Sequence, residues 1–222
     1  MLYVVATPIG NLNDASPRLK EVLVTVDAIL CEDTRVTSKL LAVFGIQKTL
    51  VAYHQHSDDR RVKEILERLA KGESLALVTD AGTPGISDPG GRLIQLIVEQ
   101  LGDSVQIVPI PGPSACIAAL SISGFPTDSF VFLGFPPHKK GRQTYFKRVA
   151  EADDTVVFYE STHRIEKTLA ELGALIGDRQ LVVCRELTKM YETTYRGTAA
   201  EVTEKLKTGS IKGEFVVVVR AI

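Results

Sequence analysis

Hydrophobic residues along this chain follow two spacings in turn, and the alternation predicts how the chain folds. Short runs of mainly apolar residues, such as Leu2–Ala6 and Ala28–Cys31, are typical of buried strands. Between such runs the apolar positions recur every three or four residues, as in Leu19–Val26, which is the spacing of an amphipathic helix. Strands that alternate with helices indicate βαβ units, so we predict an α/β protein with a largely parallel sheet.

The predicted elements form two series, separated by the proline- and glycine-rich segment Pro111–Ser114. The first series has strands at Leu2–Ala6, Ala28–Cys31, Thr49–Tyr53, Ser74–Thr79 and Val105–Ile110. Four helices are predicted in this series. The first begins at the Ser16-Pro17 cap and the third at the Ser57 cap, while the second spans Asp33–Phe44 and the fourth spans Arg92–Leu101. The second series has strands at Phe130–Phe135, Thr155–Tyr159, Leu181–Arg185 and Phe215–Arg220, with helices near Gln143–Ala152, Ile165–Ile176 and Ala199–Leu206. We therefore predict two α/β domains, residues 1–111 and 112–222.

Composition and charge narrow the class of protein. The 222 residues are 45% hydrophobic and 24% charged, which is ordinary for a globular protein and excludes disordered and collagen-like chains. The net charge of −1 gives no global basic field, so a nucleic-acid partner would need a local patch. The three cysteines are far apart in sequence, and no apolar run is long enough for a membrane span or resembles a signal peptide. We expect a soluble, cytoplasmic protein.

The densest group of glycines and prolines follows the fourth predicted strand, at Asp80–Gly91. Glycines let backbone groups approach a ligand closely, and prolines hold a loop rigid. With twelve residues the loop exceeds the usual length of such a connection, although a long connection is the simpler interpretation. Because open α/β sheets bind ligands beyond the carboxyl ends of their strands, we expect a ligand at this loop.

Other motifs find little support in the sequence. It contains neither the P-loop motif GxxxxGK(S/T) nor GxGxxG, which disfavours a P-loop nucleotidase and ordinary dinucleotide binding. Gly112–Cys116 departs from the G-x-S-x-G nucleophile elbow at its last position, and no histidine can be assigned to Ser114, so a serine hydrolase is disfavoured. His54-Gln55-His56 has no third ligand at a diagnostic spacing, so we expect a surface pair and no metal site.

Three polar clusters follow predicted strands: Glu32–Arg35, Tyr159–Arg164 and Arg185–Lys189. Adjacent acids and bases at one edge of a sheet suit the positioning of a substrate and proton transfer. Each cluster alone is also typical of a capped helix start. Three such clusters together exceed what capping predicts, so we interpret them as parts of a site.

A local basic segment lies near the start of a predicted helix in the second series. Lys139, Lys140 and Arg142 are candidate phosphate contacts for RNA, and Lys147 and Arg148 follow closely. Lysine-rich loops are also common on ordinary protein surfaces, and that interpretation stays open.

Six segments, in their order along the chain, form one recognisable set: Thr7–Leu12, Glu32–Arg35, Asp80–Gly90, Pro109–Ala115, Phe158–Arg164 and Arg185–Lys189. Together they resemble the tetrapyrrole-methylase-like superfamily of S-adenosylmethionine (AdoMet) methyltransferases. Within it they resemble the family that 2′-O-methylates cytidine 1402 of bacterial 16S rRNA, and Glu32–Arg35 and Tyr159–Arg164 point to this RNA branch. Family members usually continue past the last strand with a helical extension, so any RNA contacts of that extension are not expected here.

The resemblance implies two α/β domains with AdoMet folded in the cleft between them, in a homodimer. It implies that Asp80 organises its loop. The residues that it implies for cofactor binding are Pro8, Ala81, Gly82, Thr83, Ile86, Ser114, Ala115, Tyr159, Glu160, Gly213 and Glu214.

The implied reaction determines the catalytic candidates. A sulfonium already activates its methyl group, so the enzyme mainly aligns a ribose hydroxyl with it. The hydroxyl is weakly acidic, so a base, or a cation beside the developing alkoxide, accelerates the reaction. We expect Lys189 and Glu186 in this role, with Asp33 and Arg35 positioning the ribose or phosphate, and no metal.

The expected partner is 16S rRNA or the small ribosomal subunit. Two alternatives remain open at this point. One is an AdoMet methyltransferase for a small molecule such as a tetrapyrrole or corrin precursor, which the near-neutral charge would suit. The other is a non-catalytic module that senses AdoMet or a nucleotide.

Overall fold

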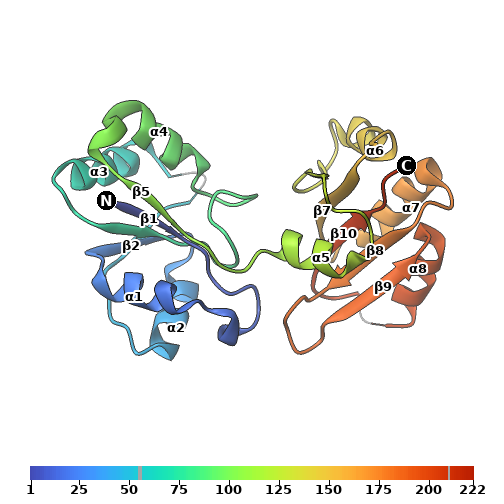
Figure 1. Ribbon diagram of the computed structural model, residues 1–222, viewed down its shortest axis with the longest axis horizontal. Coiled ribbons are helices and arrows are strands. Elements are labelled where there is room, and N and C mark those ends of the chain that lie inside the picture. Colours follow the sequence, from blue (N-terminus) through green and yellow to red (C-terminus); the bar gives the residue numbers. More distant parts are fainter. Residues whose placement is uncertain (55–56, 210) are drawn as a thin grey trace. The chain divides into compact units, whose positions relative to one another are not determined.

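The computed structural model describes residues 1–54, 57–209 and 211–222, and the chain divides into the units Met1–Ser114 and Ala115–Ile222 (Figure 1). The sequence predicts this boundary after residue 111, within the same proline- and glycine-rich segment. No helix in the described ranges has both the length and the apolar character needed to cross a membrane.

The N-terminal unit is built on one parallel sheet. Its strands are β1 (Leu2–Val5), β2 (Ala28–Cys31), β3 (Leu50–Ala52), β4 (Leu75–Leu77) and β5 (Ile107–Ile110). Its helices are α1 (Pro17–Thr25), α2 (Thr34–Val43), α3 (Asp59–Ala70) and α4 (Gly91–Leu101), with short 3₁₀ turns η1 (Leu12–Asp14) and η2 (Gly102–Ser104). The strand order is β3-β2-β4-β1-β5 with every pair parallel, which confirms the parallel sheet predicted for this half.

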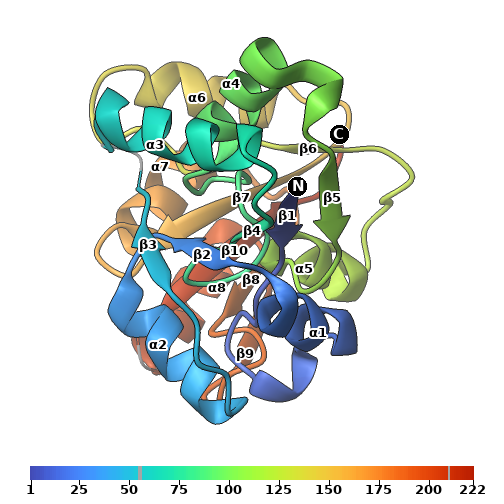
Figure 2. The same ribbon diagram turned by 90° about the vertical axis from the view of Figure 1, so that its left-hand side faces the viewer.

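Helices cover both faces of this sheet, α3 and α4 on one and α1 and α2 on the other (Figure 2). Successive side chains of a strand point to opposite faces. In β2, Ala28 and Leu30 pack with α3 and α4, whereas Ile29 and Cys31 pack with α1 and α2. A strand buried on both faces reads as the continuous apolar run seen in the sequence.

Side-chain caps fix where the helices of this unit begin. Ser16 accepts a hydrogen bond from Leu19 N and caps α1 as the sequence predicts. Asp58, and not the predicted Ser57, caps α3, because its carboxylate accepts from Arg61 N at 2.8 Å. The Ser57 hydroxyl instead accepts from His54 N.

The C-terminal unit carries a mixed sheet, which corrects the prediction of a largely parallel one. Its strands are β6 (Phe130–Phe132), β7 (Thr155–Ser161), β8 (Leu181–Arg185), β9 (Thr193–Gly197) and β10 (Glu214–Val219). The order is β6-β7-β10-β8-β9, in which only β6 and β7 pair in parallel. The helical connection does make β7 and β8 run in the same direction, but β10 lies between them and is antiparallel to both.

Four helices complete this unit: α5 (Ala115–Ser123), α6 (Arg142–Ala150), α7 (Ile165–Ile176) and α8 (Ala199–Lys207). The sequence analysis missed α5 and β9. Helix α5 is apolar around most of its circumference, so it lacks the periodicity that identifies an amphipathic helix. Strand β9 is a short edge strand with a polar sequence.

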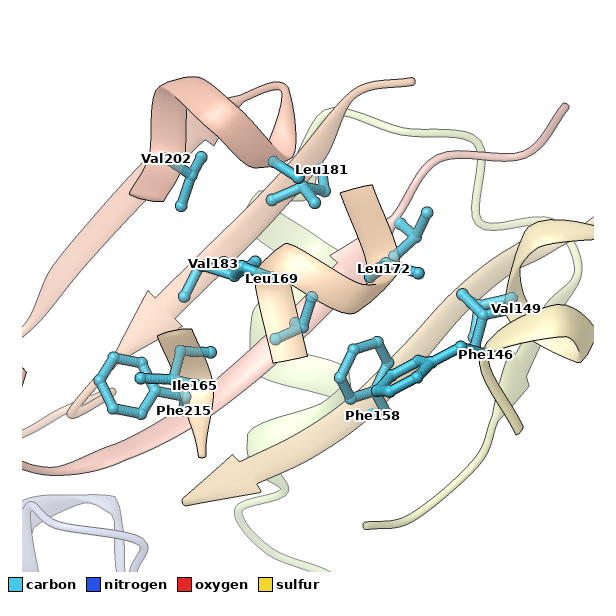
Figure 3. Close-up of a cluster of buried hydrophobic side chains, with 14 of the residues drawn as sticks. Phe146, Val149, Phe158, Ile165, Leu169, Leu172, Leu181, Val183, Val202 and Phe215 are labelled. Atoms are coloured by element: carbon cyan, nitrogen blue, oxygen red, sulfur yellow. The ribbon is translucent and has the colours of Figure 1, made fainter. Parts of the chain in front are cut away.

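One face of this sheet is covered by α6, α7 and α8 (Figure 3). Helix α5 contacts β7 and β10. The residues that Figure 3 labels in the core are Phe146, Val149, Phe158, Ile165, Leu169, Leu172, Leu181, Val183, Val202 and Phe215. Burial of this cluster provides the main stabilisation of the unit, because apolar area removed from water stabilises by about 25 cal/mol per Å².

The packing of α7 predicts a large difference between two leucines of the same helix. Leu172 is 0% exposed and Leu175 is 46% exposed. We expect Leu172→Ala to lower the free energy of unfolding by about 2–5 kcal/mol, through the cavity that it leaves. Leu175→Ala should change it by about 0.5 kcal/mol or less. Urea unfolding measures both, and equal losses would contradict the orientation of α7.

Candidate functional site

The N-terminal sheet has a topological switch point between β1 and β4. These strands are parallel neighbours, yet the helix after β1 packs on one face of the sheet and the helix after β4 packs on the other. Where connections leave neighbouring strands toward opposite faces, the loops separate and a ligand can bind beyond the carboxyl ends. The loop Asp80–Gly91 follows β4 at this point.

Backbone hydrogen bonds join the loops at this edge. Thr7 N donates to Gly82 O at 2.8 Å, and Gly82 N donates to Thr7 O at 3.2 Å. The Thr83 hydroxyl donates to Pro113 O at 3.4 Å, which brings in the segment after β5. These bonds bring the Thr7-Pro8 segment next to Gly82 and Thr83.

Two features of this edge suit a ligand that is bound by backbone groups. Gly82 has φ +88, a conformation that is strained for residues with a Cβ, and a Cβ there would touch Ile9 Cγ2 at 3.4 Å. The Thr79 hydroxyl oxygen is buried and has no hydrogen-bond partner among the described residues. Buried hydroxyls are normally hydrogen-bonded, so this one is an unsatisfied polar group directly before the loop.

The other residues expected to bind the cofactor from this unit lie nearby in sequence. Ala81 and Ile86 are exposed on the loop after β4. The Ile86 N–H donates to Thr83 O, which curls the loop at that position. Ser114 is the last residue of the N-terminal unit, and Ala115 is the first residue of α5.

Asp33 and Arg35 form a capped helix start at the carboxyl end of β2. The Asp33 carboxylate accepts from Arg35 N at 2.8 Å and from the Arg35 guanidinium at 2.6 Å. These bonds, above all those from the Arg35 side chain, lower the pKa of Asp33 to about 2. Asp80 accepts from Asp33 N at 3.3 Å, which joins the loop after β4 to the loop after β2. The Asp33 carboxylate is thus engaged in structure, whereas Arg35 is exposed.

In the C-terminal sheet, several loops meet at one edge. Because β6, β7 and β8 run in the same direction and β10 opposes them, the ends of those three strands meet the start of β10. This edge gathers most of the site residues predicted in this half: Tyr159, Glu160, Glu186, Lys189, Gly213 and Glu214.

Lys189 is held between two carboxylates at this edge. Its ammonium donates to Glu186 Oε1 at 2.9 Å and to Glu214 Oε2 at 2.8 Å. Glu186 Oε1 also accepts from Glu214 N at 2.9 Å. Glu186 and Lys189, which the sequence analysis expects in the catalytic role, are therefore in direct contact.

The backbone that carries this cluster is strained. Glu186 and Thr188 have φ values of +53 and +65, a conformation that is uncommon for residues with a Cβ and rare for a β-branched one. Opposite them, Gly213 has φ +125, and a Cβ there would lie 2.6 Å from Glu186 Cγ. Arg185 holds the loop by donating to Lys212 O and Tyr191 O. Strain of this kind concentrates at functional sites, where it positions groups that chemistry requires.

The electrostatics fix the charge of both groups. Burial alone raises the pKa of Glu186, but the hydrogen bonds from Glu214 N and Lys189 outweigh it and lower that pKa. Burial alone lowers the pKa of Lys189, but the bonds to Glu214 and Glu186 outweigh it and raise that pKa. At neutral pH the pair is therefore an ammonium and a carboxylate, and Lys189 is a fixed cation and not a base.

The structure corrects the expected role of the Glu160 side chain. Glu160 is buried, and its carboxylate accepts from Arg164 at 2.8 Å, from the Thr168 hydroxyl at 2.6 Å and from Ser161 N at 2.7 Å. A buried carboxylate needs such partners, and these leave it inside the protein. Its side chain is an internal anchor and does not line a ligand site.

Arg142 is corrected in the same way. The sequence analysis grouped it with Lys139 and Lys140, but the structure buries it. Its guanidinium donates to Glu171 at 2.6 Å and to the Thr168 hydroxyl at 2.7 Å. Lys139 and Lys140 are exposed, so the basic surface of this loop consists of the lysines without Arg142.

Tyr159 belongs to an aromatic group that the sequence analysis missed. Its hydroxyl accepts from Cys116 N at 3.2 Å. Its ring centroid lies 5.0 Å from that of Phe132 and 5.4 Å from that of Phe135, both edge to face. Phe135 is nevertheless 49% exposed. The sequence pattern that could have drawn attention to this loop is an aromatic residue followed by two prolines and two lysines.

The histidine pair considered as a metal site is only partly described. His54 follows β3, whereas Gln55 and His56 lie outside the described residues. Within the described ranges, no group of three or more histidine, cysteine, aspartate or glutamate side chains is arranged to hold a metal ion.

The sequence matches known proteins along most of its length. Residues 1–203 match the family described as Tetrapyrrole (Corrin/Porphyrin) Methylases. A Xylella fastidiosa protein named ribosomal RNA small subunit methyltransferase I is 47% identical over 99% of this chain and 81% of its own length. A Bacillus subtilis protein of the same name is 42% identical over 99% of this chain and 74% of its own length.

Solved structures support the fold. The methyltransferase CobJ superposes with a TM-score of 0.73 at 18% identity, covering 99% of this chain and 93% of CobJ. Diphthine synthase gives a TM-score of 0.72 at 18% identity, covering 99% of this chain and 89% of its own.

The charge pair at the C-terminal edge predicts how stability depends on pH. Folding lowers the pKa of Glu186 from its ordinary value of 4.5, so its contribution is full above that value and is lost as the pH falls through the lowered pKa. The stability difference between the unmodified chain and Glu186→Gln should stay constant from neutral pH to about 5 and shrink at lower pH.

Urea unfolding at several pH values measures this difference. The control is Glu204→Gln, since the exposed Glu204 pairs with Lys207 on the same helix and should contribute little. A difference that grows as the pH falls would contradict the assignment of Glu186.

Proposed function

Because this chain belongs to the tetrapyrrole methylase family, in the ribosomal RNA small subunit methyltransferase I group, we propose that it methylates the 2′-hydroxyl of cytidine 1402 in 16S rRNA, with AdoMet as donor. The chain is a methyltransferase by that membership. The choice of nucleotide and hydroxyl rests on the resemblance of its motifs. The structural observation that supports the proposal most is the cation Lys189, held at the end of a strained loop.

The N-terminal edge suits AdoMet. Gly82 has a φ of +88 that residues with a Cβ rarely adopt, so no side chain covers its backbone, and the buried Thr79 hydroxyl lacks a partner among the described residues. We assign the methionine and ribose parts of the cofactor to the loop with Ala81, Gly82 and Thr83. AdoMet, when bound, supplies a methyl group that its sulfonium has already activated.

At the C-terminal edge, Lys189 acts on the acceptor. As the 2′-oxygen forms its bond to the methyl carbon, the carbon–sulfur bond breaks and the hydroxyl proton leaves to water. The Lys189 ammonium stabilises the negative charge that develops on this oxygen. Glu186 and Glu214 hold that ammonium in place. Because the pKa of Glu186 is lowered, its carboxylate is a weak base, and we assign it to positioning.

The RNA requires its own contacts, because the chain has a net charge of only −1. We assign phosphate contacts to the exposed Lys139 and Lys140, and a ribose or phosphate contact to the exposed Arg35. Asp33 positions Arg35 through its short ion pair. Arg142 has no part in these contacts.

The proposal extends to assembly and compartment. The motif resemblance supports a homodimer, and the reaction with ribosomal RNA supports a cytoplasmic enzyme. Sedimentation of the purified chain tests the assembly.

Transfer of labelled methyl groups tests the function directly. The purified chain is incubated with labelled AdoMet and small ribosomal subunits, or naked 16S rRNA, from cells that lack this methylation. Mass mapping should find one added methyl group on the ribose of cytidine 1402. Label on a porphyrin or corrin precursor, with none on rRNA, would favour the small-molecule alternative. Absence of any single-turnover transfer would favour a sensing module.

The cofactor assignment predicts the effect of filling the N-terminal edge. Thr83→Arg should abolish AdoMet binding in calorimetry, because the longer side chain occupies the space beside Gly82, while the circular dichroism spectrum stays the same. Thr25→Arg is the matched control, since Thr25 ends α1 and is exposed. Equal AdoMet affinity of both variants would contradict the assignment.

The role of Lys189 predicts a loss of rate and not of cofactor binding. Lys189→Ala should lower kcat by roughly 10²–10³-fold, as for the loss of a positioned transition-state donor, with AdoMet affinity unchanged. Lys207→Ala, at an exposed position on α8, should leave both quantities unchanged. An unchanged kcat with weakened AdoMet binding would assign Lys189 to the cofactor site.

A further inference from the structure

The loop between β6 and α6 presents an aromatic ring together with two lysines. Phe135 is 49% exposed, and Lys139 and Lys140 follow four and five residues later and are also exposed. Phenylalanine is among the residues most often fully buried. Here the loop carries a half-exposed ring within five residues of two exposed lysines, so it offers both an apolar face and two cations. Neither the assigned contacts nor the charge cluster at Lys189 uses this ring.

Three hydrogen bonds to backbone carbonyls hold this loop in place. Arg164 donates to Pro136 O at 2.9 Å, and Arg142 donates to Pro137 O at 3.2 Å. Tyr159 N donates to Gly134 O at 2.9 Å, which ties the loop to the end of β7. Two prolines and three backbone contacts therefore fix the position of Phe135 before any ligand arrives.

The position of the ring relates it to the reaction. Phe135 packs edge to face on Tyr159, which lies near the carboxyl end of β7. Strands β7 and β8 end at the same edge of the sheet, and Lys189 follows β8. A group bound on Phe135 is therefore held at the edge that carries the proposed catalytic cation.

An exposed aromatic ring on the same loop as two exposed lysines suits single-stranded nucleic acid. Unpaired bases stack on aromatic side chains while lysines contact the neighbouring phosphates. A base in a duplex cannot stack in this way, because its faces are already covered by its neighbours. A preformed surface also reduces the ordering that binding requires.

We propose that Phe135 is a stacking platform for an unpaired base of the RNA substrate, with Lys139 and Lys140 contacting the flanking phosphates. This inference rests on the proposed function, because it assumes an RNA substrate. It adds a specificity: the enzyme selects a nucleotide whose neighbourhood is single-stranded. It also adds a purpose for Arg142 and Arg164, which hold the platform in position.

The absence of tryptophan from the sequence gives a direct test. Phe135→Trp introduces a single tryptophan at the platform, which can be excited selectively over the six tyrosines. A single-stranded oligoribonucleotide of about ten nucleotides should quench its fluorescence by stacking, whereas the same sequence in a duplex should not. Phe130→Trp is the matched control, because Phe130 is 39% exposed but lies at the amino end of β6. Its fluorescence should not respond to either RNA.

Affinity and kinetics give a second measurement. Phe135→Leu keeps an apolar side chain but removes the ring, and it should weaken binding of the single strand by roughly 5- to 100-fold. Phe135→Tyr should restore the affinity. In methyl transfer, Phe135→Leu should raise KM for RNA, with kcat and AdoMet affinity near those of the unmodified chain.

The outcomes separate this inference from the proposed function. If Phe135→Trp methylates rRNA but is not quenched by the single strand, the platform is wrong while the function stands. Quenching by AdoMet alone and not by RNA would assign the ring to the cofactor and overturn the inference. If the unmodified chain transfers no methyl group to rRNA, yet the single strand quenches the fluorescence of the Phe135→Trp variant, the proposed function fails and the platform remains.

Discussion

The C-terminal edge depends on the ion pair and hydrogen bonds that the buried Glu160 carboxylate makes. It is buried at the end of β7, so it must be neutralised and hydrogen-bonded where it stands. Arg164 pairs with it directly, and Arg142 joins through the Thr168 hydroxyl that both contact. The same two arginines hold the backbone of the loop after β6 at Pro136 and Pro137. One buried charge thereby fixes the start of α7 and the loop that carries the basic surface.

The sequence predicts the N-terminal unit better than the C-terminal one for a topological reason. Where every strand is followed by a helix, the parallel sheet follows from the alternation, and β1 to β5 are found close to their predicted bounds. Alternation cannot reveal that a strand from later in the chain inserts between two others, as β10 does between β7 and β8. Helix α5 has little contrast between its faces, so the periodicity that would identify it is missing.

Contacts among the candidate site residues follow from the sequence where the partners are close along the chain. Glu186 and Lys189 are three residues apart, and their contact follows from one tight loop. The burial of Arg142 depends on Glu171 in another helix, 29 residues away, which no local pattern indicates. The basic run therefore combines two kinds of cation: Arg142 forms buried hydrogen bonds, whereas Lys139 and Lys140 are exposed to solvent. Similarly, the left-handed backbone of Thr188 contradicts its local preference and was not predictable.

The place of β10 in the sheet has a consequence for synthesis of the chain. Among the ten strands of the described residues this one comes last in sequence, but it is the central strand of its sheet and pairs with β7 and with β8. The N-terminal sheet has all its strands once residue 110 has left the ribosome. Until residue 219 has emerged, the other sheet exists only as two separate pairs of strands with exposed edges. The two halves of this enzyme therefore mature at different times, and the later half is the one more open to aggregation during synthesis.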